Sequence, residues 1–262
     1  MKILTWNINS VRLRAGLVQD AIKILAPDVV CLQETKTPDE FFPHEAFESL
    51  GFHHRHINGM KGYNGVAILS RSPFENPRIF SRVGRDDCRH ISVRFPQFEL
   101  HNLYIPAGGD IPERKQNEKF GHKLDFVDEI TNWFGKTYTP KDPLVVAGDF
   151  NIAPLEHDVW SHKQLLDVVS HTPIETEKLS AFQSGLKWTD AARHFIPKSE
   201  KCYTWWSYRN RDWKVSNRGR RLDHIWVTEP LKDNLASHQV LTEARDWTQT
   251  SDHVPVSISL SL

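Results

Sequence analysis

Acidic residues stand at the borders of several short apolar runs of the kind that form buried β-strands. Glu34 and Asp149 come at the end of such runs, and Asp223 begins one. A single acid in this position most often serves as a turn residue or a helix cap. Three of them, with Asn7 and Asn151 in comparable positions, instead predict a site assembled at one edge of the fold.

The donor atoms of these side chains are hard oxygens. The 3 Cys residues are far apart, so a paired-thiolate zinc site is not plausible. Oxygen ligands suit Mg²⁺ or Mn²⁺, which bind through one or two carboxylates together with a substrate phosphate. The pattern therefore predicts Mg²⁺ as the cofactor, with Mn²⁺ as a substitute.

One histidine stands out from the others by its neighbours. His253 follows Asp252 directly and precedes the apolar run 254–258. An isolated Asp-His pair is most often a satisfied histidine of the core. In a phosphodiesterase, however, an imidazole held by an acceptor orients or protonates groups near the scissile phosphate. Beside the strand-end acids, His253 is a candidate catalytic residue.

The elements that position these residues are mostly short strands. The runs predicted as strands are 2–7, 28–33, 65–70, 90–95, 99–104, 144–148, 203–207, 223–228 and 254–260. In one predicted helix the apolar residues of 17–25 share a single face, with Ser10 as the N-terminal cap and Pro27 marking the end. A longer helix is predicted from a cap at Asp110 to Phe134. Weaker helical patterns lie around 160–170 and 186–195.

Nine strands are too many for one doubly wound sheet, and no linker or low-complexity tract divides the chain. We therefore expect one α/β domain over residues 1–262, built from two packed β-sheets with helices outside. Such a fold would collect the strand-end polar groups at one rim.

Composition excludes several classes of protein. The 33 basic and 33 acidic residues balance, and 9 Trp residues argue against disorder. The longest apolar runs have four residues, far short of the ~20 needed to cross a membrane. The first residues read as a strand rather than a signal peptide, and three scattered cysteines suit a reducing compartment. We expect a cytoplasmic protein without a membrane partner.

Seven segments in order resemble the exonuclease III family of abasic-site (AP) endonucleases, within the endonuclease/exonuclease/phosphatase superfamily. The matching segments are 5–12, 27–36, 62–70, 102–106, 147–151, 221–223 and 251–256. Each motif alone could occur by chance, but the set spans almost the whole chain. The resemblance implies a four-layered αββα sandwich, in agreement with the strand count.

The resemblance also implies roles for individual residues. The implied metal-binding set is Asn7, Glu34, Asp149, Asn151, Asp252 and His253, with Glu34 as the principal Mg²⁺ ligand. The implied catalytic set is Tyr104, Asp149, Asn151, Asp223 and His253. In it, Asp149 orients or deprotonates the attacking water, Tyr104 and Asn151 contact the scissile phosphate, and Asp223 pairs with His253. The number of metal ions and the identity of the general base stay open.

The activity implied is that of a Mg²⁺-dependent DNA-repair nuclease of base excision repair. It would cut 5′ to abasic sites in duplex DNA as a monomer, with 3′–5′ exonuclease and 3′-phosphatase or phosphodiesterase activity on blocked 3′ ends. The alternatives are a superfamily phosphatase or phosphodiesterase acting on a nucleotide or other small phosphoester, and a DNA-binding protein that has lost catalysis.

Substrate choice must come from residues other than the shared acids. The residues predicted to bind DNA are Trp205, Trp206, Arg209, Arg211, Lys214 and Arg220. The Trp pair is similar to an aromatic wall that receives the baseless sugar in the DNA-repair branch, and the basic residues suit phosphate contacts. Arg220 departs from the pattern, because several family members carry a bulky apolar residue there. The stretch 156–184 matches only loosely, and we assign it a DNA-backbone or packing role.

Overall fold

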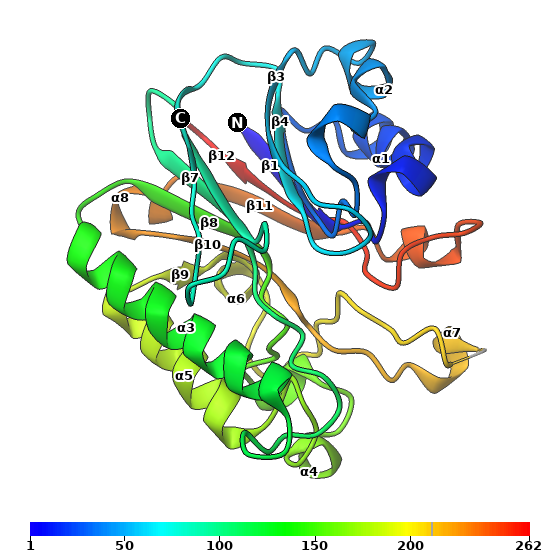
Figure 1. Cartoon of the computed structure of the whole chain (residues 1–262), viewed down its shortest axis with the longest axis vertical. Helices are drawn as coiled ribbons and strands as arrows, with labels where there is room; N and C mark the ends of the chain where they lie inside the picture. Colours follow the sequence, from blue (N-terminus) through cyan, green and yellow to red (C-terminus); the bar gives the residue numbers. More distant parts are fainter. Residues whose placement is uncertain (211) are drawn as a thin grey trace.

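The computed structural model describes residues 1–210 and 212–262. Two six-stranded mixed sheets pack face to face, and helices cover the outer face of each (Figure 1). The strand order is β11-β12-β1-β2-β4-β3 in the first sheet and β5-β6-β7-β8-β10-β9 in the second. The predicted four-layered sandwich is confirmed.

The elements have the following bounds. The first sheet contains β1 (Lys2–Asn7), β2 (Val29–Gln33), β3 (His54–Asn58), β4 (Val66–Ser70), β11 (Leu235–Val240) and β12 (Val256–Leu260). The second contains β5 (Glu75–Ile79), β6 (His90–Arg94), β7 (Glu99–Tyr104), β8 (Leu144–Asp149), β9 (Thr189–Asp190) and β10 (Asp223–Val227). The helices are α1 (Val11–Leu25), α2 (His44–Glu48), α3 (Glu118–Thr137), α4 (His162–Leu165), α5 (Pro173–Gly185), α6 (Ala191–Phe195), α7 (Trp213–Ser216) and α8 (Glu229–Lys232).

Three apolar layers follow from the two-residue alternation of the strands. In β1, Ile3 packs between the two sheets, whereas Leu4 and Trp6 face the layer that contains α1. A third layer joins the second sheet to α3 and α5. Because both faces of each sheet are covered, β2 and β8 are buried along their whole length and are mostly apolar, whereas β7 buries the polar residues Glu99, His101 and Asn102.

The topology brings several strand ends to one rim. β1 runs parallel to β2 and pairs Asn7 with Gln33, and β7 runs parallel to β8 and pairs Tyr104 with Asp149. β10 is antiparallel to β8 and begins at this same end, so Asp223 lies opposite Asp149. The two sheets are tied near the rim by Gln33, whose Nε2 donates to Asn102 Oδ1 over 2.7 Å.

Some strand predictions were wrong. Residues 203–207 form no strand, and Trp205 makes only isolated bridges with Arg220 and His253. The strands β3, β5, β9 and β11 were not predicted. All five residues of β5 are exposed, so it lacks the apolar alternation by which a strand is recognised.

The helix predictions were partly right. The two main predictions correspond to α1 and α3, and the weaker patterns at 160–170 and 186–195 contain only the short helices α4 and α6. α1 ends before Pro27, as predicted, but no side-chain hydrogen bond from Ser10 caps its start. The start of α3 is capped by Asn117, whose side chain accepts from the Lys119 amide, rather than by Asp110. α5 was not predicted, although Thr172 and Glu175 form a capping box at its start, and the short helices α2, α7 and α8 were not predicted either.

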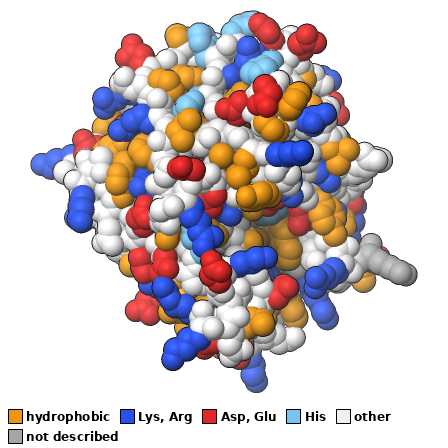
Figure 2. All heavy atoms as spheres, viewed as in Figure 1, with side chains coloured by type: hydrophobic (Ala, Val, Ile, Leu, Met, Phe, Trp, Pro, Cys, Tyr) orange, Lys and Arg blue, Asp and Glu red, His pale blue; other side chains and the backbone are white. Residues whose placement is uncertain are grey.

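The surface mixes both signs of charge. Figure 2 shows Lys and Arg side chains interspersed with Asp and Glu over the face that it displays, in keeping with the zero net charge. The segment that carries α7 projects from the body of the molecule (Figure 1). Among the helices that the structure describes, none has the length and apolar character needed to traverse a bilayer.

Candidate active site

The centre of the rim is a hydrogen-bonded chain of three side chains. Asn7 is fully buried, and its Nδ2 donates to Glu34 Oε1 over 2.9 Å and to Asp149 Oδ2 over 2.8 Å. Glu34 follows β2, Asn7 ends β1 and Asp149 ends β8, so the chain joins the two sheets. A buried amide between two carboxylates fixes both of them in position.

Two of the rim residues have a strained backbone. Glu34 has φ 51° and Asn151 has φ 53°, in the left-handed region that residues other than glycine seldom adopt. Glycine is required at position 148, directly before Asp149, because a Cβ there would lie 1.9 Å from the Leu103 carbonyl oxygen. Strain of this kind is typical of functional sites, where the surrounding structure enforces it.

Glu34 is held by three side chains, Asn7, Tyr104 and Lys36. The Tyr104 hydroxyl donates to its Oε1 over 2.8 Å, and Lys36 Nζ lies 2.7 Å from its Oε2. Burial by itself raises the pKa of Glu34, but the Lys36 charge and the hydrogen bonds from Asn7, Lys36 and Tyr104 bring it below its ordinary value. Glu34 is therefore ionised at neutral pH.

Tyr104 remains a hydrogen-bond donor in this setting. Burial and the neighbouring Glu34 charge raise the pKa of the Tyr104 hydroxyl well above its ordinary value. Lys36 was part of a recognised motif, but the sequence reasoning gave it no role. Its signal is its position two residues after the predicted metal ligand.

A second group combines His253 with two aspartates. His253 Nδ1 donates to Asp223 Oδ2 over 2.8 Å, and its Nε2 lies 3.7 Å from Asp149 Oδ2. Burial lowers the pKa of His253, but the charges of Asp223 and Asp149 outweigh this effect and raise it to about 10. Burial raises the pKa of Asp149 to about 7, against the opposing effect of the His253 charge. The imidazolium is thus held between two buried acids.

Two further residues complete the catalytic geometry. Thr204 Oγ1 donates to Asp223 Oδ2 over 2.6 Å, a contact that sequence reasoning missed because the two residues meet only in the folded chain. The main-chain amide of Asn151 donates to Asp149 Oδ1 over 2.8 Å, and its Nδ2 donates to Asp149 Oδ2 over 3.0 Å. Both oxygens of Asp149 are therefore aligned.

The donor set is suited to a divalent cation. A carboxylate oxygen of Asp149 and one of Asp223 lie within 4.8 Å of each other. Among the described residues, Asp223 Oδ1 is buried without a hydrogen-bond partner, and the Lys36 ammonium shows that a cation is stabilised beside Glu34. Asp223 was not in the predicted metal set. Asp252 was, but its Oδ2 accepts from Trp205 Nε1 over 2.9 Å, which places it beside the cluster.

The two tryptophans of the predicted aromatic wall have different environments. Trp206 is only 3% exposed and packs against Tyr203 and Trp213, so its assignment to the DNA-binding wall is corrected to a core position. Trp205 is partly exposed, and the Arg220 guanidinium lies 5.2 Å from the centre of its ring. Trp205 alone is placed to form a wall beside His253.

The predicted basic residues are also spread over different environments. Arg220 Nη1 donates to the Val169 carbonyl over 2.9 Å and to Ser170 Oγ over 2.7 Å, so the loosely matched stretch 156–184 supports the wall by packing. Lys214 forms an ion pair with Asp246, and Arg209 is exposed. Arg211 lies outside the described residues.

A pocket of about 700 Å³ adjoins the rim at Tyr104. It is bordered by the segment 106–109 and by side chains of both charges. The polar side chains that line it include Tyr63, Asn64, Arg85, Asp86, Asp87, Arg89, Glu118, Lys119 and His122.

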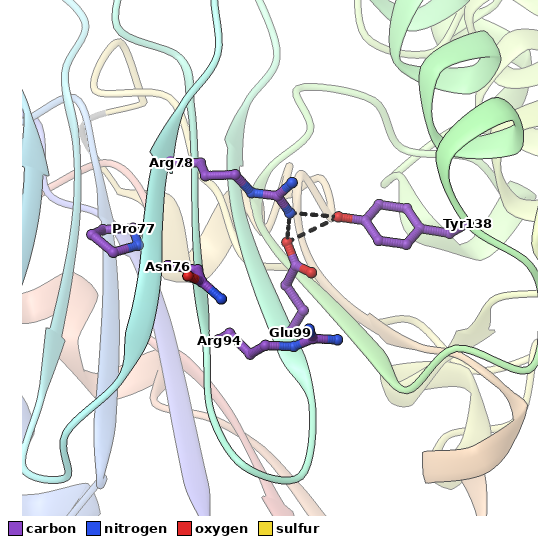
Figure 3. A pocket seen from close by; sticks show the side chains of 6 residues that line it. All are labelled: Asn76, Pro77, Arg78, Arg94, Glu99 and Tyr138. Atoms are coloured by element: carbon purple, nitrogen blue, oxygen red, sulfur yellow. Dashed lines mark hydrogen bonds and ion pairs between the residues drawn. The ribbon is translucent and has the colours of Figure 1, made fainter.

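Another pocket, of about 440 Å³, lies at the opposite end of β7 (Figure 3). In it, Arg78 and Tyr138 point toward Glu99, and Tyr138 donates its hydroxyl hydrogen to Glu99 Oε1 over 2.9 Å. Burial by itself raises the pKa of Glu99, but His101, Tyr138 and Arg78 bring it down to about 2. This cluster stabilises the fold and is remote from the rim.

Glu99→Gln is expected to lower Tm at pH 7 by roughly 3–10 °C, because hydrogen bonds to a buried charge are lost. A carboxyl whose pKa is lowered by folding stabilises the protein above its ordinary value of 4.5, and this contribution disappears as the pH falls toward about 2. Thermal unfolding of both proteins followed by circular dichroism should therefore show a Tm difference that shrinks with acidification. A difference independent of pH would contradict this assignment.

Comparison with known proteins agrees with this geometry. Residues 4–253 match the Endonuclease/Exonuclease/phosphatase family. The chain is 29% identical to exodeoxyribonuclease III of Haemophilus influenzae over 272 residues, with 98% of each chain covered. It is 28% identical to DNA repair nuclease APEX1 of Danio rerio, covering 100% of this chain and 83% of that protein.

Solved structures agree equally well. An AP endonuclease from Archaeoglobus fulgidus superposes with a TM-score of 0.92 at 30% identity. A 3′ phosphatase from Neisseria, solved with a product DNA hairpin, superposes with a TM-score of 0.91 at 29% identity. Both comparisons cover 100% of each chain.

The fold and the site define a metal-assisted phosphoester hydrolase. The chain belongs to the endonuclease/exonuclease/phosphatase family, as the family match over almost its whole length shows. The relatives and solved structures confirm the predicted exonuclease III type within that family and the prediction of a hydrolytic nuclease.

Proposed function

We propose that the protein is a Mg²⁺-dependent DNA-repair nuclease that hydrolyses the phosphodiester 5′ to abasic sites in duplex DNA and also removes 3′-blocking groups. The observation that carries the proposal is the convergence of Asp149, His253 and Glu34 at one rim beside the partly exposed Trp205. The named activities of the relatives support it.

The residues of the site divide the chemistry between them. Asp149 accepts hydrogen bonds from Asn7 and Asn151 that orient its carboxylate, so it can align a water molecule for attack on phosphorus and take up its proton. The His253 imidazolium, held by Asp223, can donate to a phosphate oxygen as negative charge builds there. The single hydroxyl hydrogen of Tyr104 is donated to Glu34 Oε1, so a phosphate oxygen that contacts Tyr104 would have to compete with Glu34 for it.

Glu34, Asn7 and the acids of the His253 group are the residues that would hold Mg²⁺. When bound, the ion neutralises charge that develops on the phosphate oxygens. Glu34 is ionised and positioned for this role by Asn7 and Tyr104. Lys36 Nζ also lies 2.7 Å from Asn9 Oδ1, so it keeps a second partner when a cation takes its place at Glu34.

A panel of synthetic duplexes tests the proposal. The purified protein is incubated with Mg²⁺ and with duplexes that carry an internal abasic analogue, a 3′-phosphate or neither, and with a nucleoside monophosphate. We expect incision 5′ to the abasic analogue and release of the 3′-phosphate. Hydrolysis of the nucleotide alone would overturn the proposal in favour of a small-phosphoester phosphatase.

Trp205→Ala is expected to lower kcat/KM at abasic sites by roughly 10- to 100-fold, because contacts with an aromatic face contribute about 1–3 kcal/mol. The kcat/KM for removal of a 3′-phosphate should fall much less, since this reaction does not require the enzyme to bind an extrahelical sugar. The comparison is made by initial rates on the two duplexes. Trp206→Ala is the contrasting variant, because a cavity in the core should lower Tm and affect both activities in parallel. Equal losses in Trp205→Ala would exclude it as the lesion wall.

A further inference from the structure

A buried ion pair lies behind the catalytic rim. Lys123 of α3 and Glu175 of α5 are both 0% exposed, and Lys123 Nζ lies 2.5 Å from Glu175 Oε1. Burying two charges carries a large desolvation cost, so such a pair is often no more stabilising than apolar side chains of the same size. The contacts of this pair indicate a role in the site.

The Lys123 ammonium holds the two segments that carry catalytic side chains. Its Nζ donates to the main-chain carbonyl of Asn151 over 2.8 Å and to that of Ala107 over 3.3 Å. Asn151 follows Asp149 at the end of β8, and Ala107 follows Tyr104 at the end of β7. The ammonium therefore fixes both segments from the side away from the rim. One of its two partners, Asn151, has a φ of 53°, a strained conformation that needs such support.

Glu175 extends the network to the substrate wall. Its carboxylate accepts from the Ser170 amide over 2.9 Å and from Thr172 Oγ1 over 2.7 Å. Ser170 Oγ in turn accepts from Arg220 Nη1 over 2.7 Å, and Arg220 lies over Trp205. One buried network thus connects the Asn151 carbonyl with the Trp205 wall.

We propose that Lys123 is a positioning residue for hydrolysis: it holds Asn151, and through Asn151 the carboxylate of Asp149, in the reactive geometry. Glu175 keeps the ammonium charged and aligned. The inference rests on the proposed function, because it assigns Asp149 and Asn151 to the reaction. Lys123 itself touches neither water nor substrate in this arrangement.

The test separates positioning from stability by removing both charges together. Lys123→Met alone leaves a buried unpaired carboxylate, so its Tm should fall. The double variant Lys123→Met, Glu175→Gln has no buried charge at these positions, and its Tm should return toward that of the wild type. We expect kcat of the double variant to remain about 10- to 100-fold below that of the wild type, with KM little changed, because small displacements of reacting groups cost rates of this order.

The chain offers a matched control that links the same two helices. Lys178 of α5 pairs with Asp128 of α3 at the surface, 2.6 Å apart and away from the Asn151 carbonyl. The double variant Lys178→Met, Asp128→Asn should keep the kcat of the wild type. All assays use the duplex that the wild type cleaves fastest, at a temperature at which circular dichroism shows each variant folded.

The outcomes distinguish this inference from the proposed function. A wild-type protein that cleaves no duplex would overturn the proposed function and, with it, the assignment of Lys123. An active wild type with a fully active Lys123→Met, Glu175→Gln variant would overturn the inference alone. A loss of kcat that is confined to this variant, and absent from the Lys178 control, supports it.

Discussion

Asp149→Asn is expected to lower kcat by about 10²–10⁴-fold on every duplex that the wild type cleaves, the range typical of a lost acid or base. Asp149 is fully buried, and its two oxygens are aligned by Asn7 and Asn151. An amide keeps the size of this side chain but cannot take a proton from water. Single-turnover kinetics at saturating enzyme measure the chemical step directly.

The same substitution should leave folding and DNA binding largely intact. Burial and the charges of Asp223 and Glu34 destabilise the ionised Asp149 carboxylate, against the opposing His253 charge, so a neutral side chain relieves part of this cost. The amide nitrogen loses hydrogen bonds that a carboxylate oxygen accepts, so we expect a Tm close to that of the wild type, and unchanged DNA affinity by fluorescence anisotropy in EDTA. The exposed Asp20→Asn serves as the control. Near-normal turnover in Asp149→Asn would remove this residue from the reaction.

Glu34→Ala is expected to raise the Mg²⁺ concentration needed for half-maximal activity by at least about tenfold. Mutating a residue that only hydrogen-bonds to a metal ligand typically lowers metal affinity by about 10- to 100-fold, so loss of a ligand should cost at least as much. Glu34 offers an ionised carboxylate at the centre of the rim, and no other acid among the described residues contacts Asn7, Tyr104 and Lys36 together. Titrating Mg²⁺ against initial rate measures the effect.

The control for this titration is Glu45→Ala, an exposed glutamate of α2, whose neighbours Ala46 and Phe47 pack in the outer layer of the sandwich. It should show the Mg²⁺ dependence of the wild type. EDTA should stop hydrolysis of all substrates by the wild type, and added Mg²⁺ should restore it. A Glu34→Ala variant with an unchanged Mg²⁺ requirement would show that the ion binds elsewhere.

The sandwich was predictable where burial leaves a pattern in the sequence. β1, β2 and β8 are mostly apolar because both sheet faces are covered, and their carboxyl ends carry the polar residues that mark the rim. β5 has only exposed residues, and its strand conformation depends on pairing with β6. The segment 203–207 shows the opposite error, because Tyr203 and Trp206 pack in the core and Trp205 makes only isolated bridges, without forming a strand.

The acids of the site could be predicted because strand-end carboxylates are visible in the sequence, whereas their partners depend on contacts between distant segments. Thr204 reaches Asp223 only through the fold. Lys123 did leave a signal: it is a charged residue on the face of α3 that also carries Phe120, Phe126 and Val127 among its buried side chains. A lysine on a buried helix face indicates a buried partner.

The central claim is that one rim performs both incision at abasic sites and removal of 3′-phosphates. It is tested most directly by measuring the rate of abasic-site incision, in Mg²⁺, at increasing concentrations of the duplex with a 3′-phosphate. We predict competitive inhibition, with an inhibition constant equal to KM for hydrolysis of the 3′-phosphate. Incision that is unaffected at concentrations that saturate 3′-phosphate hydrolysis would contradict a shared site.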